Sequence, residues 1–233
     1  MNPTSARSRR HHGFTLVEML VVMGIVLMLM VLLAPAFTKL KSAGDVTSAA
    51  YTIKGMLDQA RTYAMSNNTY TYVGFAGSIG TTAASVTGQV MLAAFVSTDG
   101  TQSGLSSGNY RQFGKLMKLD NTHIGDTGVP TPDGTEFESR ATVDPSHRIS
   151  SAGAGAYTIT AQQTTFKRWI QFSPRGEAVV NGNASITQYA EVGIQPTHGT
   201  ALAVSQDANG KWIGNIVAVQ ISGFSGNVRI YRR

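Results

Sequence analysis

The sequence contains no cysteine, which excludes disulfide cross-links, thiol catalysis and cysteine-ligated zinc sites. Charged residues are also scarce, at 14%, and proline occurs only 7 times in 233 residues. A hydrophobic content of 42% with so few charges argues against a disordered chain. The 25 glycines and the many threonines favour antiparallel sheets with tight turns, in one domain or one domain plus an appendage.

The common catalytic motifs are missing as well. No glycine-rich phosphate loop lies between a strand and a helix, and neither G-x-S-x-G nor H-E-x-x-H occurs. His11 and His12 lie near the N-terminus, while His123, His147 and His198 are scattered among turn residues, a pattern typical of solvated loop histidines. We therefore expect no enzyme activity, no catalytic residue, no cofactor and no metal site.

Acidic side chains gather in and beside a predicted loop over residues 121–146. Oxygen ligands of this kind bind calcium in other proteins, but the spacing here does not resemble an EF-hand. Calcium binding is the lesser alternative, and a merely solvated acidic loop is favoured. The residues concerned are Asp120, Asp126, Asp133, Glu136, Glu138 and Asp144.

The net charge of +6 is unevenly placed. Arg7, Arg9 and Arg10 lie in the first 13 residues, which contain no acid. Without them 16 basic and 13 acidic residues remain, a net charge of +3. The body of the chain is only mildly basic, so charge alone is weak evidence for nucleic-acid binding.

Residues 14–37, FTLVEMLVVMGIVLMLMVLLAPAF, form an apolar run whose one charge is Glu18. The run is about long enough to cross a bilayer as a helix. The basic residues before it outnumber Lys39 and Lys41 after it, which predicts a cytoplasmic N-terminus and an exported body.

Three interpretations of this run compete. A signal peptide cut near Ala34-Pro35-Ala36 and a plain membrane anchor both leave Glu18 unexplained, because a carboxylate inside a span is costly. Cleavage between Gly13 and Phe14 explains it, since the new amine would lie about one helical turn from Glu18. If subunits stack with a stagger, that amine can pair with the carboxylate of a neighbour and set the register of assembly.

The residues RRHHGFTLVEMLVVMGIVLMLM closely resemble the N-terminal signal of type IV prepilins and type II secretion pseudopilins. The resemblance implies that a prepilin peptidase cuts after Gly13 and methylates the amine of Phe14. It also implies a helix bend at Pro35. The implied partners are other pilin or pseudopilin subunits, the prepilin peptidase and an inner-membrane assembly platform.

Beyond the apolar run, residues 38–67 predict an amphipathic continuation of the same helix, which would end at Ser66-Asn67-Asn68. Apolar residues recur there at three- and four-residue spacing and mark one face. We expect this face to pack on a globular domain. Its members are Val46, Ala49, Ala50, Ile53, Leu57, Ala60 and Ala64.

From residue 68 onward, short runs rich in β-forming residues alternate with glycine, serine, asparagine and proline. The predicted class is α+β, with a long N-terminal helix and an antiparallel head of two packed sheets. The predicted division is a leader over 1–13, a transmembrane helix over 14–37, the amphipathic helix over 38–67 and a periplasmic head over 68–233. The expected strands cover 69–75, 89–96, 111–119, 156–160, 166–172, 178–180, 190–194, 216–221 and 227–231.

Two C-terminal motifs carry a second resemblance. Phe172-Ser173-Pro174-Arg175-Gly176 and Gly226-Asn227-Val228-Arg229-Ile230 resemble the hairpin and the final strand of H-type (GspH/FimT-like) minor pseudopilins. Proline and glycine at these spacings are turn residues, so a structural turn is favoured over an active site. The resemblance implies a structural minor pseudopilin of a type II secretion pseudopilus or a minor pilin of a type IV pilus.

Two alternatives stay open. Arg229, Arg232 and Arg233 surround Tyr231, and basic residues with an interleaved aromatic contact single-stranded nucleic acid in other proteins. A DNA-uptake minor pilin is therefore one alternative, although a charged edge strand that resists aggregation explains the same residues. The other alternative is a membrane-anchored extracytoplasmic domain unrelated to filaments.

Overall fold

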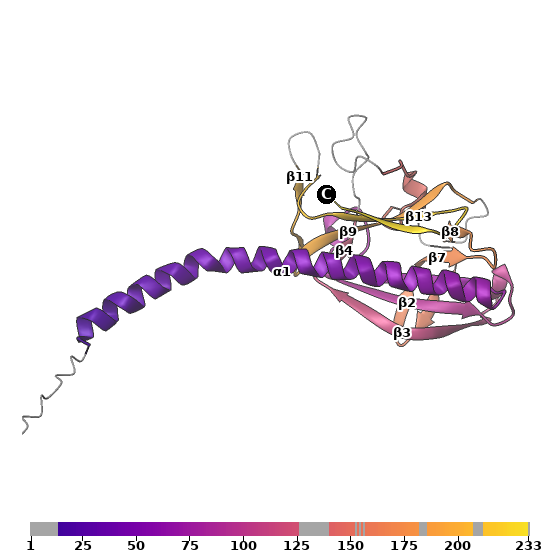
Figure 1. Ribbon diagram of the computed structural model, residues 1–233. Helices are drawn as coiled ribbons and strands as arrows, with labels where there is room; N and C mark the ends of the chain where they lie inside the picture. Colours follow the sequence, from indigo (N-terminus) through magenta and orange to yellow (C-terminus); the bar gives the residue numbers. More distant parts are fainter. Residues whose placement is uncertain are drawn as a thin grey trace, which may run out of the picture. The chain divides into compact units, whose positions relative to one another are not determined.

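The computed structural model describes residues 14–125, 140–151, 153, 155, 157–181, 186–206 and 212–232, without the side chains of 32–43, 83, 206 and 212. The chain divides into two compact units, Met1–Lys41 and Ser42–Arg233. Helix α1 (Leu16–Ser66) begins in the first unit and ends in the second (Figure 1). Antiparallel strands follow it, which confirms the α+β class.

The second part of α1 buries the face that its spacing predicts. All seven predicted contact residues are at most 2% exposed: Val46, Ala49, Ala50, Ile53, Leu57, Ala60 and Ala64. The helix ends where the sequence predicts, because Asn68 turns to a left-handed φ of 49°. The Thr69 amide then donates to the Ala64 carbonyl over 3.1 Å.

The first large sheet has the strand order β3-β2-β1-β7-β8, with every neighbouring pair antiparallel. A bulge interrupts the pairing of its edge strand between Leu92 and Ala94. Its strands are β1 (Thr71–Gly77), β2 (Gln89–Ser97), β3 (Tyr110–Asp120), β7 (Arg168–Phe172) and β8 (Ala178–Val180).

The second large sheet has the order β10-β9-β13-β14, and β4 also pairs with β9. Its strands are β4 (Thr122–Ile124), β9 (Tyr189–His198), β10 (Ala201–Leu202), β13 (Val217–Ser222) and β14 (Val228–Arg232). Two small hairpins complete the described strands: β5 (Ile159–Ala161) with β6 (Thr164–Phe166), and β11 (Ser205–Gln206) with β12 (Trp212–Ile213).

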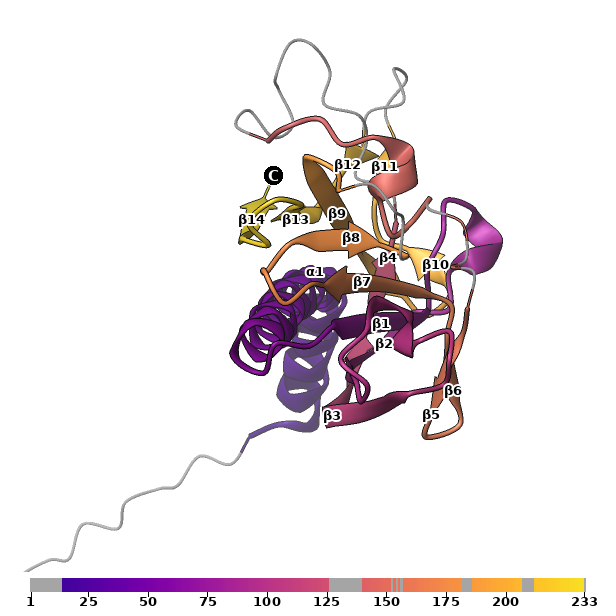
Figure 2. The same cartoon turned by 90° about the vertical axis from the view of Figure 1, so that its right-hand side faces the viewer.

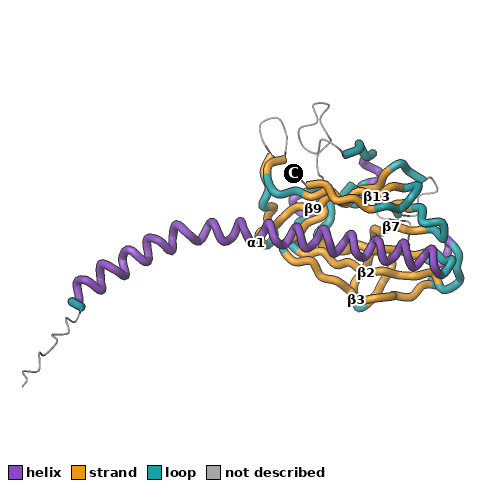
Figure 3. Tube along the Cα trace, viewed as in Figure 1, coloured by secondary structure: helices purple, strands orange, loops and turns teal. Residues whose placement is uncertain are grey.

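Helix α1 and both large sheets enclose one apolar core. Figures 2 and 3 show how the helix lies against the strands in the second unit. Alternate residues of each strand face it, as the two-residue period of a strand requires. In β13, Val217, Val219 and Ile221 join this core, while Ala218 and Gln220 face the other side. The expectation of a head built from two packed sheets is thereby met.

A second apolar cluster covers the opposite face of the first sheet. Phe166 packs there edge-on to Phe95, with ring centroids 5.4 Å apart. Gly74 makes this possible, because a Cβ at that position would sit 3.0 Å from the Phe166 ring. The β5–β6 hairpin therefore lies directly on the middle of the sheet.

The proline–glycine motif forms the predicted structural turn between β7 and β8. The Gly176 amide donates to the Ser173 carbonyl over 2.8 Å, and Gly176 has a φ of 84°, which favours glycine. Gly226 lies in the turn between β13 and β14, and a Cβ there would collide with the Gly176 carbonyl and with Arg61. Both motifs therefore bring turns of the two sheets together against α1.

Two strand predictions and one loop prediction are wrong in detail. The run 166–172 divides into β6 and β7, because the chain leaves the small hairpin at Phe166 and enters the large sheet at Arg168. The predicted loop 121–146 begins with strand β4, whose three residues are too few to show a hydrophobic period. The expected strand 156–160 shortens to β5, at Ile159–Ala161.

Candidate functional site: the start of the long helix

A reciprocal pair of hydrogen bonds opens α1. The Thr15 hydroxyl accepts from the Glu18 amide over 3.2 Å, and the Glu18 carboxylate accepts from the Thr15 amide over 3.4 Å. Thr15 is thus the residue before the first helical turn, and Glu18 is three residues beyond it. This is a capping box, which satisfies two amides that a helix start leaves without partners.

The capping box gives Glu18 a defined position. Its carboxylate also lies in the first turn of the helix, where the positive end of the helix dipole stabilises a negative charge. Sequence reasoning identified Glu18 but missed Thr15. The signal was present, because a threonine followed three residues later by glutamate, ahead of an apolar run, predicts this cap.

The residues that follow form a helix that is apolar on every side. Apart from Thr15, Glu18 and Gly24, each residue from 14 to 31 is large, apolar and exposed, from 41% at Val26 to 81% at Leu16. A helix of this kind is covered by lipid or by other protein in its working state. Exposure on all sides also leaves it free to contact several neighbours at once.

Several predicted residues of this region lie outside the described part. Gly13 and the leader 1–13 are among them, as is the side chain of Pro35, although α1 runs through position 35. The kink at Pro35 and the membrane helix 14–37 therefore stay predictions. Considering only the described residues, no helix is long and apolar enough to cross a membrane.

Of the three C-terminal arginines, the two that the structure describes are not brought together. In β14, Arg229 pairs with Gln220 and Arg232 pairs with Val217, and their spacing of three places them on opposite faces. Arg232 donates to the Thr47 hydroxyl of α1 over 2.8 Å. Arg233 lies outside the described residues. The nucleic-acid alternative stays a prediction, and this geometry gives it no convergent basic surface.

His123 is buried rather than solvated. It lies in β4, where its Nε2 contacts the Gly80 carbonyl at 2.9 Å and its Nδ1 contacts the Ser78 hydroxyl at 2.9 Å. Burial lowers the pKa of His123 from its usual 6.5. Ser78 is itself fully buried and accepts from the Thr87 amide. This serine–histidine pair fastens the β1–β2 connection to β4 and is sealed from substrates.

A buried ion pair holds the segment that follows residue 139. Arg140 Nη1 lies 3.0 Å from Glu191 Oε2, with both side chains at most 2% exposed. Nearby, Arg148 donates to the Val143 carbonyl over 2.8 Å, and the Ile149 amide donates to the Glu191 carbonyl. Sequence reasoning missed this pair because its two members lie far apart along the chain. The pair fixes one side of the second sheet.

The acidic residues of the predicted calcium loop fall mostly outside the described part. Of the six, Asp120 and Asp144 are described. Asp120 accepts from Gln89, and Asp144 caps a short helical turn through the Ser146 amide. Hydrogen bonds from Ser146 lower the pKa of Asp144. Within the described ranges, no group of three or more His, Asp or Glu side chains is arranged to hold a metal ion.

Comparison with known proteins bears on the N-terminus alone. Residues 8–34 match the family model described as the prokaryotic N-terminal methylation motif. This match supports the pilin and pseudopilin class and a substrate of prepilin peptidase. No curated protein and no solved structure matches the chain.

Proposed function

We propose that this protein is a structural subunit of a pilin-type filament, assembled through its N-terminal helix after prepilin peptidase cuts between Gly13 and Phe14. One observation carries the proposal: a carboxylate lies one helical turn from the cleavage point, at the start of a helix that is apolar and exposed on all sides. The matching methylation motif over residues 8–34 supports the same interpretation.

The capped helix start suggests how assembly proceeds. Cleavage leaves a positively charged amine on Phe14, and methylation keeps that charge. The Glu18 carboxylate accepts one bond from the Thr15 amide, and a carboxylate has room for further donors. In an apolar environment the ammonium group of a neighbouring subunit would stabilise the Glu18 carboxylate by forming an ion pair, because no water would be there to solvate either charge. Each such pair would fix one subunit against the next.

The finer assignment is a minor pseudopilin of a type II secretion pseudopilus, most similar to the H-type, or a minor pilin of a type IV pilus. In this proposal the chain starts as a single-pass protein of the inner membrane, with its N-terminus in the cytoplasm and its head in the periplasm. It then joins a periplasmic or extracellular filament. Its partners are other pilin or pseudopilin subunits, prepilin peptidase and the inner-membrane assembly platform.

We further propose that the protein itself catalyses nothing. The buried polar groups of the described head support this, because they act within the fold. Ser78 and His123 bind each other and the nearby backbone, and Arg140 with Glu191 fastens one segment to β9. The head serves as a rigid body that the helix carries into the filament.

The test compares Glu18→Ala with Asp58→Ala in the full chain, produced in its own bacterium. Asp58 is a matched control because it is an acidic residue of the same helix, paired at 2.8 Å with Lys54 in the head. Mass spectrometry of the mature N-terminus reports cleavage, and recovery in the sheared filament fraction reports assembly. We expect both variants to start at an N-methylated Phe14 and only Glu18→Ala to be lost from filaments.

Three results would contradict the proposal. One is a mature chain that starts elsewhere, for instance at Phe37, which would indicate an ordinary signal peptide. Another is a Glu18→Ala protein that enters filaments at the level of the unchanged chain. Equal loss in both variants would mean that filament entry does not depend on the position of the carboxylate, and would also contradict it.

A further inference from the structure

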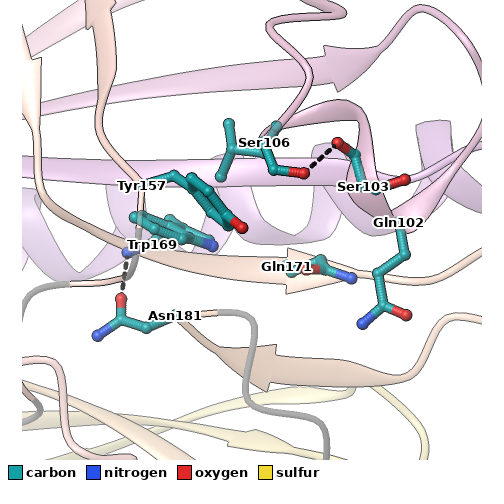
Figure 4. A pocket seen from close by; sticks show the side chains of 8 residues that line it. Gln102, Ser103, Ser106, Tyr157, Trp169, Gln171 and Asn181 are labelled. Carbon is teal, nitrogen blue, oxygen red and sulfur yellow. Dashed lines mark hydrogen bonds between the residues drawn. The ribbon is translucent and has the colours of Figure 1, made fainter.

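A hollow of about 400 Å³ lies on the outer face of the first sheet (Figure 4). Strand β7 forms its floor with Trp169 and Gln171, and the short helix Gln102–Gly104 and the segment before β5 form its sides. Its volume is within the range of about 300–1,000 Å³ that small-molecule sites occupy. We call it the Trp169 pocket, defined by Gln102, Leu105, Tyr157, Trp169, Gln171 and Asn181.

Two polar side chains on its floor have no hydrogen-bond partner in the described chain. The indole Nε1 of Trp169 is buried and has no hydrogen-bond partner in the described chain. The Gln171 side chain is 4% exposed and makes no hydrogen bond to another described residue. In Figure 4 the indole nitrogen points toward the side of the pocket where Gln171 lies. A largely buried amide such as that of Gln171 is normally paired, so its position on the floor of a hollow indicates a missing partner there.

The floor is held in place by bonds that do not involve these groups. The Trp169 amide donates to Asn181 Oδ1 over 2.9 Å, and Asn181 Nδ2 donates to the Gly153 carbonyl over 2.6 Å. The backbone at Gly155 lies against the indole so closely that any Cβ there would collide with the ring. Trp169 is therefore fixed before any ligand arrives.

The wall on the other side is fixed as well. The Tyr72 hydroxyl, from β1, donates to the Gln102 carbonyl over 3.0 Å, and burial raises the pKa of Tyr72 to about 12. The Asp99 carboxylate holds the two ends of the same loop together, because it accepts hydrogen bonds from Ser97, Thr101 and Asn109. Those hydrogen bonds hold the pKa of Asp99 well below its usual range. The pocket is thus preorganised on both sides, which lowers the entropy lost on binding.

The chemistry of the pocket is polar but uncharged. Its described lining contains amides, hydroxyls, an indole and a leucine, and no acidic or basic side chain. Of the stretches of sequence that supply it, 100–110, 150–166 and 178–190 contain no charged residue, and the one charged residue of strand β7, Arg168, is not among the lining residues. An ionic ligand would find no counter-charge among these groups, and its desolvation would be uncompensated.

An extended peptide is also a poor fit. Strand β7 is paired with β1 on one side and with β8 on the other. No free strand edge is therefore available at Trp169 and Gln171 to which a peptide could add. The remaining ligand is a compact neutral molecule with many hydroxyls and an apolar face for Tyr157 and Leu105.

We propose that the Trp169 pocket binds a neutral saccharide unit, with the Gln171 amide bonding a ligand hydroxyl beside the Trp169 indole. The unit is either a free sugar or the terminal residue of a glycan. This inference stands on the head alone and is independent of filament assembly.

The test uses the full chain in micelles of an amine-oxide detergent, because sugar-based detergents would compete. Trp212→Phe leaves Trp169 as the single tryptophan, since the chain has two. Its fluorescence and its indole N–H resonance are followed during titration with methyl glucoside, methyl galactoside, N-acetylglucosamine and maltotriose. Inorganic phosphate is the charged probe. We expect a saturable shift of the Trp169 signals with at least one sugar and none with phosphate.

Three variants assign the binding to this pocket. Gln171→Leu and Gln102→Ala should each weaken it, the former by about tenfold or more because it removes a buried partner. Gln102 is exposed, so its replacement leaves the fold intact even if Gln171→Leu does not. Gln89→Leu, at an amide of the same sheet that bonds Asp120, is the matched control and should bind normally.

The titrations distinguish the two sources of the sugar and can also overturn the proposal. Binding by the monosaccharides identifies a free sugar, and binding by maltotriose alone identifies a glycan end. The proposal is overturned if no sugar shifts the Trp169 signals at concentrations of about ten millimolar, where even weak sites fill. It is equally overturned if phosphate produces the shift, or if Gln171→Leu and Gln102→Ala both bind as the unchanged protein does.

Discussion

Helix α1 contains two regions of opposite character. In residues 14–31 every large apolar side chain is at least 41% exposed, whereas in residues 46–64 the predicted apolar face is at most 2% exposed. Both regions belong to one continuous α-helix, so a difference in helix propensity does not explain the contrast. The difference lies in what each region contacts: the second packs on the sheets of its own chain, and the first has no such cover among the described residues.

The sequences of the two regions explain this contrast. Asp45, Lys54, Asp58 and Arg61 interrupt the second region and leave one apolar face, which a single core can cover. The first region has only Glu18 and is apolar all round. Burying one face lowers the free energy of the folded head, while burying all faces requires lipid or other subunits. One region therefore stabilises the protein, and the other stays exposed in the described chain.

The largest expected effect comes from truncating a core leucine. Leu57→Ala removes a fully buried side chain and should lower the free energy of unfolding of the head by about 2–5 kcal/mol. Leu27→Ala is the matched change in the first region, where Leu27 is 64% exposed, and should leave that free energy unchanged. Urea denaturation followed by tryptophan fluorescence measures both. An equal decrease in the free energy of unfolding in the two variants would show that the two regions do not differ in their contribution to stability.

Acidification should lower the free energy of unfolding of the head through His123, and residues 14–31 contribute nothing to this effect. The pKa of His123 is lowered by burial, so between that value and about 6.5 the unfolded chain binds more protons than the folded one. Stability therefore rises with pH in this window and falls on acidification, by at most about 1.4 kcal/mol per pH unit. Residues 14–31 contain no histidine.

The measurement is the urea midpoint between pH 5 and 7. His123→Gln should flatten this pH dependence, and His198→Gln, at an exposed histidine, should retain it. A slope that survives in His123→Gln would assign the pH dependence to another group.

Removing the helix cap should loosen only the first region. Thr15→Val deletes the hydroxyl that accepts from the Glu18 amide, a loss of about 0.5–2 kcal/mol for a capping residue. Amide exchange at Glu18 should accelerate by about fivefold, with no change in the head. Thr62→Val is the control, because its hydroxyl bonds the Asp58 carbonyl inside the helix. Unchanged exchange in Thr15→Val would mean that the capping box does not form in solution.

The smallest effect comes from a glycine in each region. A Cβ at Gly55 or at Gly24 would meet nothing within 4 Å. Gly55→Ala should raise the free energy of unfolding of the head by about 0.5–1 kcal/mol, because alanine loses less backbone entropy in a helix. Gly24→Ala should leave it unchanged. A gain from Gly24→Ala would show that the two regions unfold as one unit.

Much of the fold could be predicted because it depends on local pattern. The helix and its buried face follow from spacing, and the β7–β8 turn follows from Pro174 and Gly176. Strands of five or more residues were found, whereas β4 and β10 to β12, with two or three residues each, show no period. The Arg140–Glu191 pair and the burial of His123 depend on contacts between distant segments, which no local pattern contains.

The candidate sites divide in the same way. Gly13, Phe14 and Glu18 lie within six consecutive positions, so sequence alone predicted a cleavage point and identified the charge beside it, and the structure added the Thr15 cap. The Trp169 pocket combines residues from 102 to 181 and carries no motif. Only the tertiary structure brought them together, because the antiparallel sheet sets which distant side chains share a face. A motif of neighbouring residues can be recognised in the sequence, whereas a pocket forms only when the strands pair and bring distant residues together.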